Sequence, residues 1–318
     1  MMPGGLIYYP DSMPGIARKR SGRGFSYVAP DGTTIARGAE RRRLEAMAIP
    51  PAYEDVWMTP KPNGHLMATG YDARRRKQYR YHPDWALARA ETKYESLAGF
   101  GHALPVIRAG IAHDLRARTG SERFALAAAA LLIDELAVRV GTASYAAENN
   151  TYGATTLRRR HLRLVGGALR LSWVAKGGKR VTRTIRDRRL MRALTRARDL
   201  PGTLLFTWID DEGEVRPITS QGLNAYLADL GEGPFTSKVF RTWSGTLAAF
   251  EAHRENPSAG IGALAAAAAE RLGNTPAVAR ESYIHPKVLD LVGAEPAALP
   301  APLEGLSPAE TGLLALLD

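Results

Sequence analysis

A change of local pattern at residues 81–83 constrains the fold of this chain more than any other feature. Before that point, short apolar runs such as Gly24–Val28 are separated by turn signals such as Pro62-Asn63-Gly64. After it, apolar residues recur at spacings of three and four, as on one face of an amphipathic helix. The sequence therefore predicts an α+β protein, with a small β-rich N-terminal domain (1–82) followed by a mainly α-helical domain (83–292).

The helical domain is expected to contain one β-hairpin. Residues 169–175 and 180–185 alternate apolar and polar side chains on either side of Gly177 and Gly178. Adjacent glycines supply the positive φ that a tight hairpin turn requires, so the tip carries Lys176 and Lys179. The predicted helices are Arg37–Ala48, Asp84–Leu97, Leu104–Arg118, Glu122–Val140, Asp187–Ala197, Ser220–Leu230, Ser237–His253 and Ile261–Leu272.

Residues 293–318 differ in composition from the rest of the chain. They contain no Lys or Arg and are rich in Pro, Ala and Leu. This composition predicts an acidic, mostly disordered tail with a short helix near its end.

The charge of the chain indicates a polyanionic partner. The 43 Lys and Arg residues exceed the 32 Asp and Glu residues, which gives a net charge of +11 and a pI near 10.0. Such an excess favours nucleic acid first and an anionic membrane surface second. No apolar run reaches the roughly 18 residues of a membrane span, and the start lacks the pattern of a secretory signal. Because the chain also has no cysteine, we expect a cytoplasmic protein that binds nucleic acid and not a membrane.

The common motifs for nucleotide and metal chemistry are absent. The sequence has no GxxxxGK[ST], no GxGxxG after a strand, no HExxH and no GxSxG. The acidic run 210–212 lies between turn signals and is expected to be a solvated loop. The sequence therefore predicts no cofactor, no bound nucleotide and no metal.

Tyr283 lies on the helix with the clearest end signals. Gly273 can end the preceding helix in the left-handed conformation, Thr275 is a favourable N-cap, and Pro276 suits the first helical position. A tyrosine can accept a phosphoryl group if basic residues help, because a phenol ionises only near pH 10. Arginines match the charge of the transition state, and a lysine can protonate the leaving oxygen. Taken singly, such residues are more often explained by packing or solvation.

Four ordered segments resemble the type IB DNA topoisomerases in their short viral and bacterial form. They are Ile49–Trp85, Arg139–His161, Ser237–Thr246 and Leu272–Pro286, within a resemblance that runs from Gly15 to about Val292. The resemblance implies a monomer that relaxes supercoiled duplex DNA without ATP or metal. It would cleave one strand through a 3′-phosphotyrosyl intermediate, allow rotation and religate. It also implies a C-shaped clamp that the N-terminal domain closes around the duplex, and a place at the nucleoid.

The resemblance assigns roles to individual residues. Tyr283 would be the nucleophile, Arg139 and Arg241 would bind the scissile phosphate, and Lys176 rather than Lys179 would protonate the 5′ oxygen. Where the family often has histidine, this chain has Asn274, which can donate a hydrogen bond to the phosphate but cannot be protonated. The residues expected to contact DNA are Arg76, Lys77, Gln78, Tyr79, Tyr81, Arg159 and Lys238.

Three other classes of protein are alternatives to this one. A tyrosine recombinase, or integrase-type strand transferase, uses the same set of side chains but typically has histidine three residues before the second arginine, where this chain has Lys238. A DNA-binding protein without activity would not need Arg139, Lys176, Arg241 and Tyr283 together. A metal-dependent nuclease would need a carboxylate cluster supported by helices or strands. The recombinase is the nearest alternative.

Overall fold

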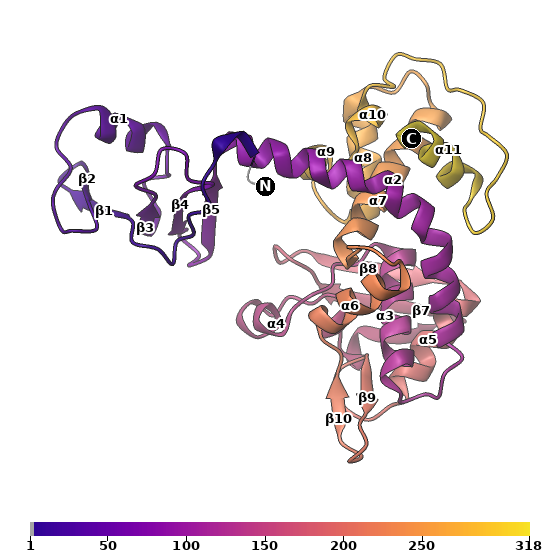
Figure 1. Ribbon diagram of the computed structural model, residues 1–318. Coiled ribbons are helices and arrows are strands. Elements are labelled where there is room, and N and C mark those ends of the chain that lie inside the picture. The colour runs from indigo at the N-terminus through magenta and orange to yellow at the C-terminus, as the bar shows by residue number, and fades with distance from the viewer. Residues whose placement is uncertain (1–2) are drawn as a thin grey trace. The chain divides into compact units, whose positions relative to one another are not determined.

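In the computed structural model, which describes residues 3–318 but not the side chains of residues 90–93, the chain forms two compact units. They are Met1–Tyr94 (unit 1) and Glu95–Asp318 (unit 2). Unit 1 contains a β-sheet, and unit 2 is mostly helical with a β-hairpin (Figure 1). The predicted α+β class is therefore confirmed.

Unit 1 is an antiparallel sheet of five strands in the order β2-β1-β3-β4-β5. Its core includes Tyr27, Met58 and Leu44, the last from the expected helix. Because β5 is an edge strand, much of its surface stays exposed. The elements are a 3-10 helix (Pro3–Gly5), β1 (Ile16–Ser21), β2 (Gly24–Val28), α1 (Ala39–Ala46), β3 (Glu54–Met58), β4 (Leu66–Tyr71) and β5 (Lys77–Tyr81).

Helix α2 (Pro83–Asp114) is continuous where two separate helices were expected. Gly101 lies in the interval between the two predicted helices and serves packing. A Cβ at this position would lie 2.7 Å from Cη2 of Trp243 and 2.8 Å from Cδ1 of Leu314. The glycine therefore lets other helices of unit 2 approach α2, and the predicted interruption was wrong.

Helix α3 (Glu122–Leu136) is the centre of unit 2. Its ten residues from Phe124 to Ile133 are all buried, many of them alanines that permit close helix contact. The surrounding helices include α7, and α7, α8 and α9 pack in succession (Figure 1). No helix among the described residues is both long and apolar enough to span a membrane. The other helices are α4 (Ala143–Asn149), α5 (Arg188–Arg198), α6 (Ser220–Leu230), α7 (Ser237–Glu255), α8 (Ile261–Leu272), α9 (Pro276–Tyr283), α10 (Pro286–Leu289) and α11 (Pro308–Leu317), with 3-10 turns at Ala154–Thr156 and Arg159–His161.

The expected hairpin of unit 2 is present as β7 (Ala168–Val174) and β8 (Arg180–Ile185). Gly177 and Gly178 at its tip have φ of 88° and 79°, as the turn requires. A third strand, β6 (Leu162–Val165), pairs with β7 and was not predicted, because four residues are too short a run to show a period. A smaller hairpin consists of β9 (Thr207–Ile209) and β10 (Val215–Pro217), with the acidic run 210–212 at its turn as expected.

The end of the chain is ordered, so the expectation of a mostly disordered tail does not hold for residues 308–317. The short helix expected there is α11, which begins with a capping box between Ser307 and Glu310. Arg108 joins Glu310 of α11 to Asp134 of α3, with contacts of 2.8 Å and 2.9 Å. Composition alone missed this order, because it cannot show that the apolar face of α11 packs against α7.

Candidate active site

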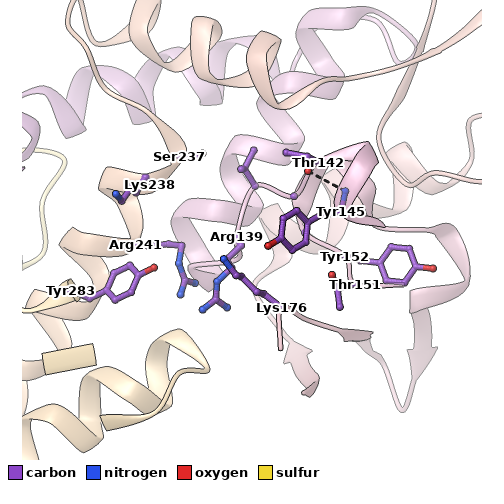
Figure 2. A pocket seen from close by; sticks show the side chains of 13 residues that line it. Arg139, Thr142, Tyr145, Thr151, Tyr152, Lys176, Ser237, Lys238, Arg241 and Tyr283 are labelled. Carbon is purple, nitrogen blue, oxygen red and sulfur yellow. Dashed lines mark hydrogen bonds between the residues drawn. The ribbon is translucent and has the colours of Figure 1, made fainter. Parts of the chain in front are cut away.

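One pocket in unit 2, with a volume of about 320 Å³, collects four of the five predicted catalytic side chains (Figure 2). They are Arg139, Lys176, Arg241 and Tyr283, from four separate parts of the sequence. We call it the active pocket. Its other lining residues are Val140, Gly141, Thr142, Tyr145, Thr151, Tyr152, Gly153, Ser237 and Lys238.

The backbone of Arg139 lies in a loop. The prediction that a helix continues to Val140 was wrong. Helix α3 ends at Leu136, and Ala137 takes the left-handed conformation with φ of 50°. The loop then lies against a second segment, where the Ala154 N–H donates to the Arg139 carbonyl at 2.8 Å. A Cβ on Gly141 would lie 2.8 Å from the nitrogen of Gly153, so only glycine permits this contact. The loop therefore fixes where Arg139 enters the pocket.

Asn274 holds the side chain of Arg139. Nη2 of Arg139 donates to Oδ1 of Asn274. Gly273 ends α8 in the left-handed conformation, and the Asn274 N–H bonds back to the carbonyl of Ala269 at 2.9 Å, which fixes the asparagine backbone. The buried Nδ2 of Asn274 has no partner among residues 3–318. Asn274 does not line the active pocket, and its hydrogen bond places it behind the Arg139 guanidinium. Its expected direct contact with phosphate stays a prediction.

Arg241 is the most enclosed of the candidate residues, with 4% of its surface exposed. It lies on α7, and its guanidinium donates to the carbonyls of Ala137 and Leu272, the latter at 3.3 Å. Burial, followed by the nearby charge of Arg139, lowers the pKa of Arg241 to about 10. Arg241 remains charged at neutral pH and is fixed by two helix ends.

Tyr283 is the last residue of α9, and its backbone is fixed by α7. Its carbonyl accepts a hydrogen bond of 3.0 Å from Oγ1 of Thr246. A Cβ on Gly245 would lie 3.1 Å from both Cβ and O of Tyr283, so the glycine allows α7 this close. In Figure 2 the hydroxyl of Tyr283 points toward the guanidinium of Arg241, whose Cζ lies 5.1 Å from the centre of the tyrosine ring.

The surroundings of Tyr283 favour its ionised form. Burial acts to raise the pKa of Tyr283. The charge of Arg241, a hydrogen bond with Arg241, and the charges of Arg139 and Lys238 outweigh burial and bring the pKa below the usual 10.0. The hydroxyl is thus prepared to act as a nucleophile.

Lys176 and not Lys179 faces the active pocket. It lies at the tip of the β7–β8 hairpin, with Nζ 5.5 Å from the centre of the Tyr145 ring. Both lysines are exposed, so the hairpin itself and not a buried contact sets their position. The placement favours Lys176 as the proton donor.

The two tyrosines predicted to contact DNA lie together in unit 1. Tyr79 and Tyr81 are exposed on β5, with parallel rings whose centres are 6.2 Å apart. Strand alternation places them on the same face of the sheet. Flat, exposed rings of this kind can pack against sugars or bases.

The polar residues beside these tyrosines already have partners in unit 1. Arg76 lies 2.6 Å from Asp72, and Nε2 of Gln78 donates to the same carboxylate at 3.1 Å. Lys77 lies 2.5 Å from Asp11. These side chains are held in place, and contact with phosphate would compete with the carboxylates.

Arg159 has a local structural role that its sequence context did not reveal. Its guanidinium donates to the carbonyl of Arg198, at the end of α5, and to that of Gly202 at 2.9 Å. The helix end therefore occupies donors that had been expected to bind phosphate. Lys238, by contrast, is exposed and lines the active pocket.

Sequence reasoning missed three residues that shape the pocket. Tyr145 and Tyr152 line it from α4 and from the segment before β6. Gly245 lies inside a predicted helix, where a glycine costs stability, and that cost was the available signal of close packing. Tyr145 carried no such signal, because α4 itself was not predicted, and Tyr152 lies outside the helices and strands.

Two guanidinium groups, a lysine and a tyrosine of lowered pKa around one pocket define a site suited to phosphoryl transfer to tyrosine. Comparison with known proteins agrees. The eukaryotic DNA topoisomerase I catalytic core family matches residues 78–282, and the bacterial DNA topoisomerase IB N-terminal domain matches residues 24–72. A DNA topoisomerase 1B of Acanthamoeba polyphaga mimivirus is 27% identical over 299 residues, which cover 89% of each chain. This chain belongs to the type IB DNA topoisomerase family.

Proposed function

We propose that this protein relaxes supercoiled duplex DNA by cutting one strand with Tyr283, allowing rotation and resealing the strand. The observation that carries the proposal is the arrangement of the active pocket. The hydroxyl of Tyr283 faces Arg241, in a pocket shared with Arg139 and Lys176.

The cleavage step can be written with these side chains and water. Tyr283 gives up its proton to solvent, which the lowered pKa favours, and its oxygen attacks phosphorus. The bond from phosphorus to the 5′ oxygen breaks, and Lys176 protonates that oxygen. The products are a 3′-phosphotyrosyl bond and a free 5′-hydroxyl. Religation reverses each step, with the proton returning to Lys176.

The two arginines stabilise the charge that develops on the non-bridging oxygens. Arg241 is held by two carbonyls and Arg139 by Asn274, so neither has to reorganise as the charge forms. Lys238 adds positive charge at the rim of the pocket. Asn274 acts through Arg139.

The wider proposal concerns how the duplex is held. Tyr79, Tyr81 and Gln78 on β5 would contact the DNA, and the two units would form a C-shaped clamp around it. The protein would act as a monomer at the nucleoid in the cytoplasm, without a nucleotide or metal. Support comes from the exposed tyrosine pair, the net charge of +11 and the family.

A tyrosine recombinase remains the alternative activity. It would join strands from two duplexes and would need a partner protomer. Lys238, where recombinases typically have histidine, favours relaxation within one duplex.

Relaxation of supercoiled plasmid in EDTA and without ATP tests the proposal. The wild type should relax the plasmid and Tyr283→Phe should not. Tyr226→Phe is the matched control, since its hydroxyl contacts Asp114 at 3.1 Å, outside the active pocket. Nicking without resealing, or an absolute need for Mg²⁺, would overturn the proposal.

A further inference from the structure

The exposed face of the β6–β7–β8 sheet carries a second cavity, of about 790 Å³, which we call the arginine groove. Because side chains alternate along each strand, every second residue lies on this exposed face, and most of the residues between them pack on the core. Its charged residues are all arginines: Arg160, Arg163, Arg170 and Arg180.

These four guanidinium groups have no ion pair or side-chain hydrogen bond within residues 3–318, and no Asp or Glu lines the groove. Arg163 and Arg170 also face each other directly across the antiparallel strands. Like charges in directly opposite positions destabilise a sheet. A bound anion between them would remove that repulsion.

The neutral groups of the groove also suit phosphate. Burial, followed by the charges of Arg160, Arg158 and Arg180, lowers the pKa of His161 to about 4, so its ring is neutral at physiological pH. Nδ1 of His161 accepts from the Arg158 N–H at 3.1 Å, which leaves the proton on Nε2 as a donor. Charged and neutral donors together match the oxygens of a phosphodiester.

The arginine groove adjoins the active pocket. Tyr152 lines both cavities. Along β7, Arg170 faces the groove and the strand then leads to Lys176 at the hairpin tip. At ~3.3 Å per residue, Arg170 and Lys176 are about 20 Å apart, or about six base pairs at ~3.4 Å each.

We propose that the arginine groove binds the phosphate backbone of the same duplex, about six base pairs from the phosphate that Tyr283 attacks. This inference rests on the proposed function for the position of the DNA. Under this inference, Arg163 and Arg170 increase the affinity for DNA and do not affect the rate of cleavage.

The test uses Arg163→Gln/Arg170→Gln, with Arg188→Gln/Arg192→Gln on α5 as a control of equal charge and exposure. First, a cleavage site is mapped. Covalent adduct formation is then measured on duplexes in which the DNA on each side of this site, called an arm, is either short (about three base pairs) or long (about twelve). These two lengths lie below and above the ~20 Å span. With the long arm on the groove side, the half-saturating DNA concentration of the groove variant should rise ~10-fold, and its log–log salt slope should fall by ~1.8. The rate at saturation should not change.

With the groove-side arm short and the other arm long, the groove variant should match the wild type. Equal behaviour on long arms, or a loss that persists on short arms, overturns the inference. If the wild type forms no adduct at all, the proposed function fails instead. In that case, equilibrium binding to a long duplex is measured as a function of salt. A smaller log–log slope for the groove variant than for the wild type supports the inference, and an equal slope overturns it. Competition by inorganic tripolyphosphate that the variant abolishes, with DNA binding unaltered, would assign the groove to a small polyphosphate and overturn the inference.

Discussion

Arg241 in the active pocket is buried and donates to two carbonyls, whereas Arg163 and Arg170 in the arginine groove are exposed and lack partners among residues 3–318. The difference matches two different tasks. A transition state needs donors already in position, because reorganisation during the reaction costs rate. Binding a backbone needs charge that can adjust to each phosphate. In these two cavities, the fixed Arg241 therefore suits the proposed chemistry, and the free Arg163 and Arg170 suit the proposed contact with the DNA backbone.

The largest effect is expected at the hairpin tip. Lys176→Ala should slow single-turnover cleavage by ~10²- to 10⁴-fold, the range for loss of a general acid. Lys179→Ala is the matched control and should cleave at nearly the wild-type rate, because Lys179 does not line the active pocket. The reverse ranking of the two variants would transfer the role to Lys179.

Substitutions of arginine by lysine test the difference between the two regions directly. Arg241→Lys should slow cleavage by ~10²- to 10³-fold, since an ammonium cannot keep two carbonyl contacts and still present paired donors. Arg163→Lys, which keeps a free charge, should leave both cleavage and DNA affinity within a small factor of wild type. Single-turnover rates and binding titrations check both. Equal tolerance at the two positions would remove the distinction between fixed and free arginines.

The spacing between α7 and Tyr283 provides a subtler test. Gly245→Ala should displace the tyrosine backbone and slow cleavage by up to ~10²-fold, as misplacement of reacting groups by about 1 Å can do. Gly262→Ala on α8 is the control, because a Cβ there meets nothing within 4 Å. Thermal unfolding should show that both variants remain folded. A fully active Gly245→Ala protein would contradict the role of this contact.

The smallest effect is a shift in pH dependence. Because the pKa of Tyr283 lies below 10.0, the cleavage rate should rise with pH and level off before pH 10. Arg241→Gln removes the leading cause of the lowering, so the plateau should move to higher pH. The ionised Tyr283 hydroxyl stabilises the folded state only above its pKa in the unfolded chain. This contribution is lost as pH falls through its pKa in the folded chain. The change of stability with pH near neutral pH should therefore be the same in Tyr283→Phe and in the wild type, and a difference in this slope would contradict the assignment.

Local signals explain what the sequence could predict. The glycines at 177 and 178 predicted the hairpin that carries Lys176, and Gly273 with Thr275 predicted the helix of Tyr283. These features depend on a few adjacent residues. The resemblance assigns the four side chains to one site, and the active pocket brings them together.

What the sequence could not predict depends on distant partners. The end of α3 rests on Ala137, a residue with no intrinsic preference for the left-handed conformation, so the loop that presents Arg139 was missed. Arg159 finds the end of α5 only in the folded chain. The arginine groove needs the register that sets Arg163 opposite Arg170 across two strands, one of which was too short to predict.

Mapping the covalent adduct tests the central claim most directly. The protein is mixed with duplex DNA in EDTA, the reaction is stopped with denaturant, and the DNA-linked peptide and the new DNA ends are identified. We predict a bond from the Tyr283 oxygen to a 3′-phosphate, with a free 5′-hydroxyl on the other end. An adduct on another residue, or on a 5′-phosphate, would contradict the account.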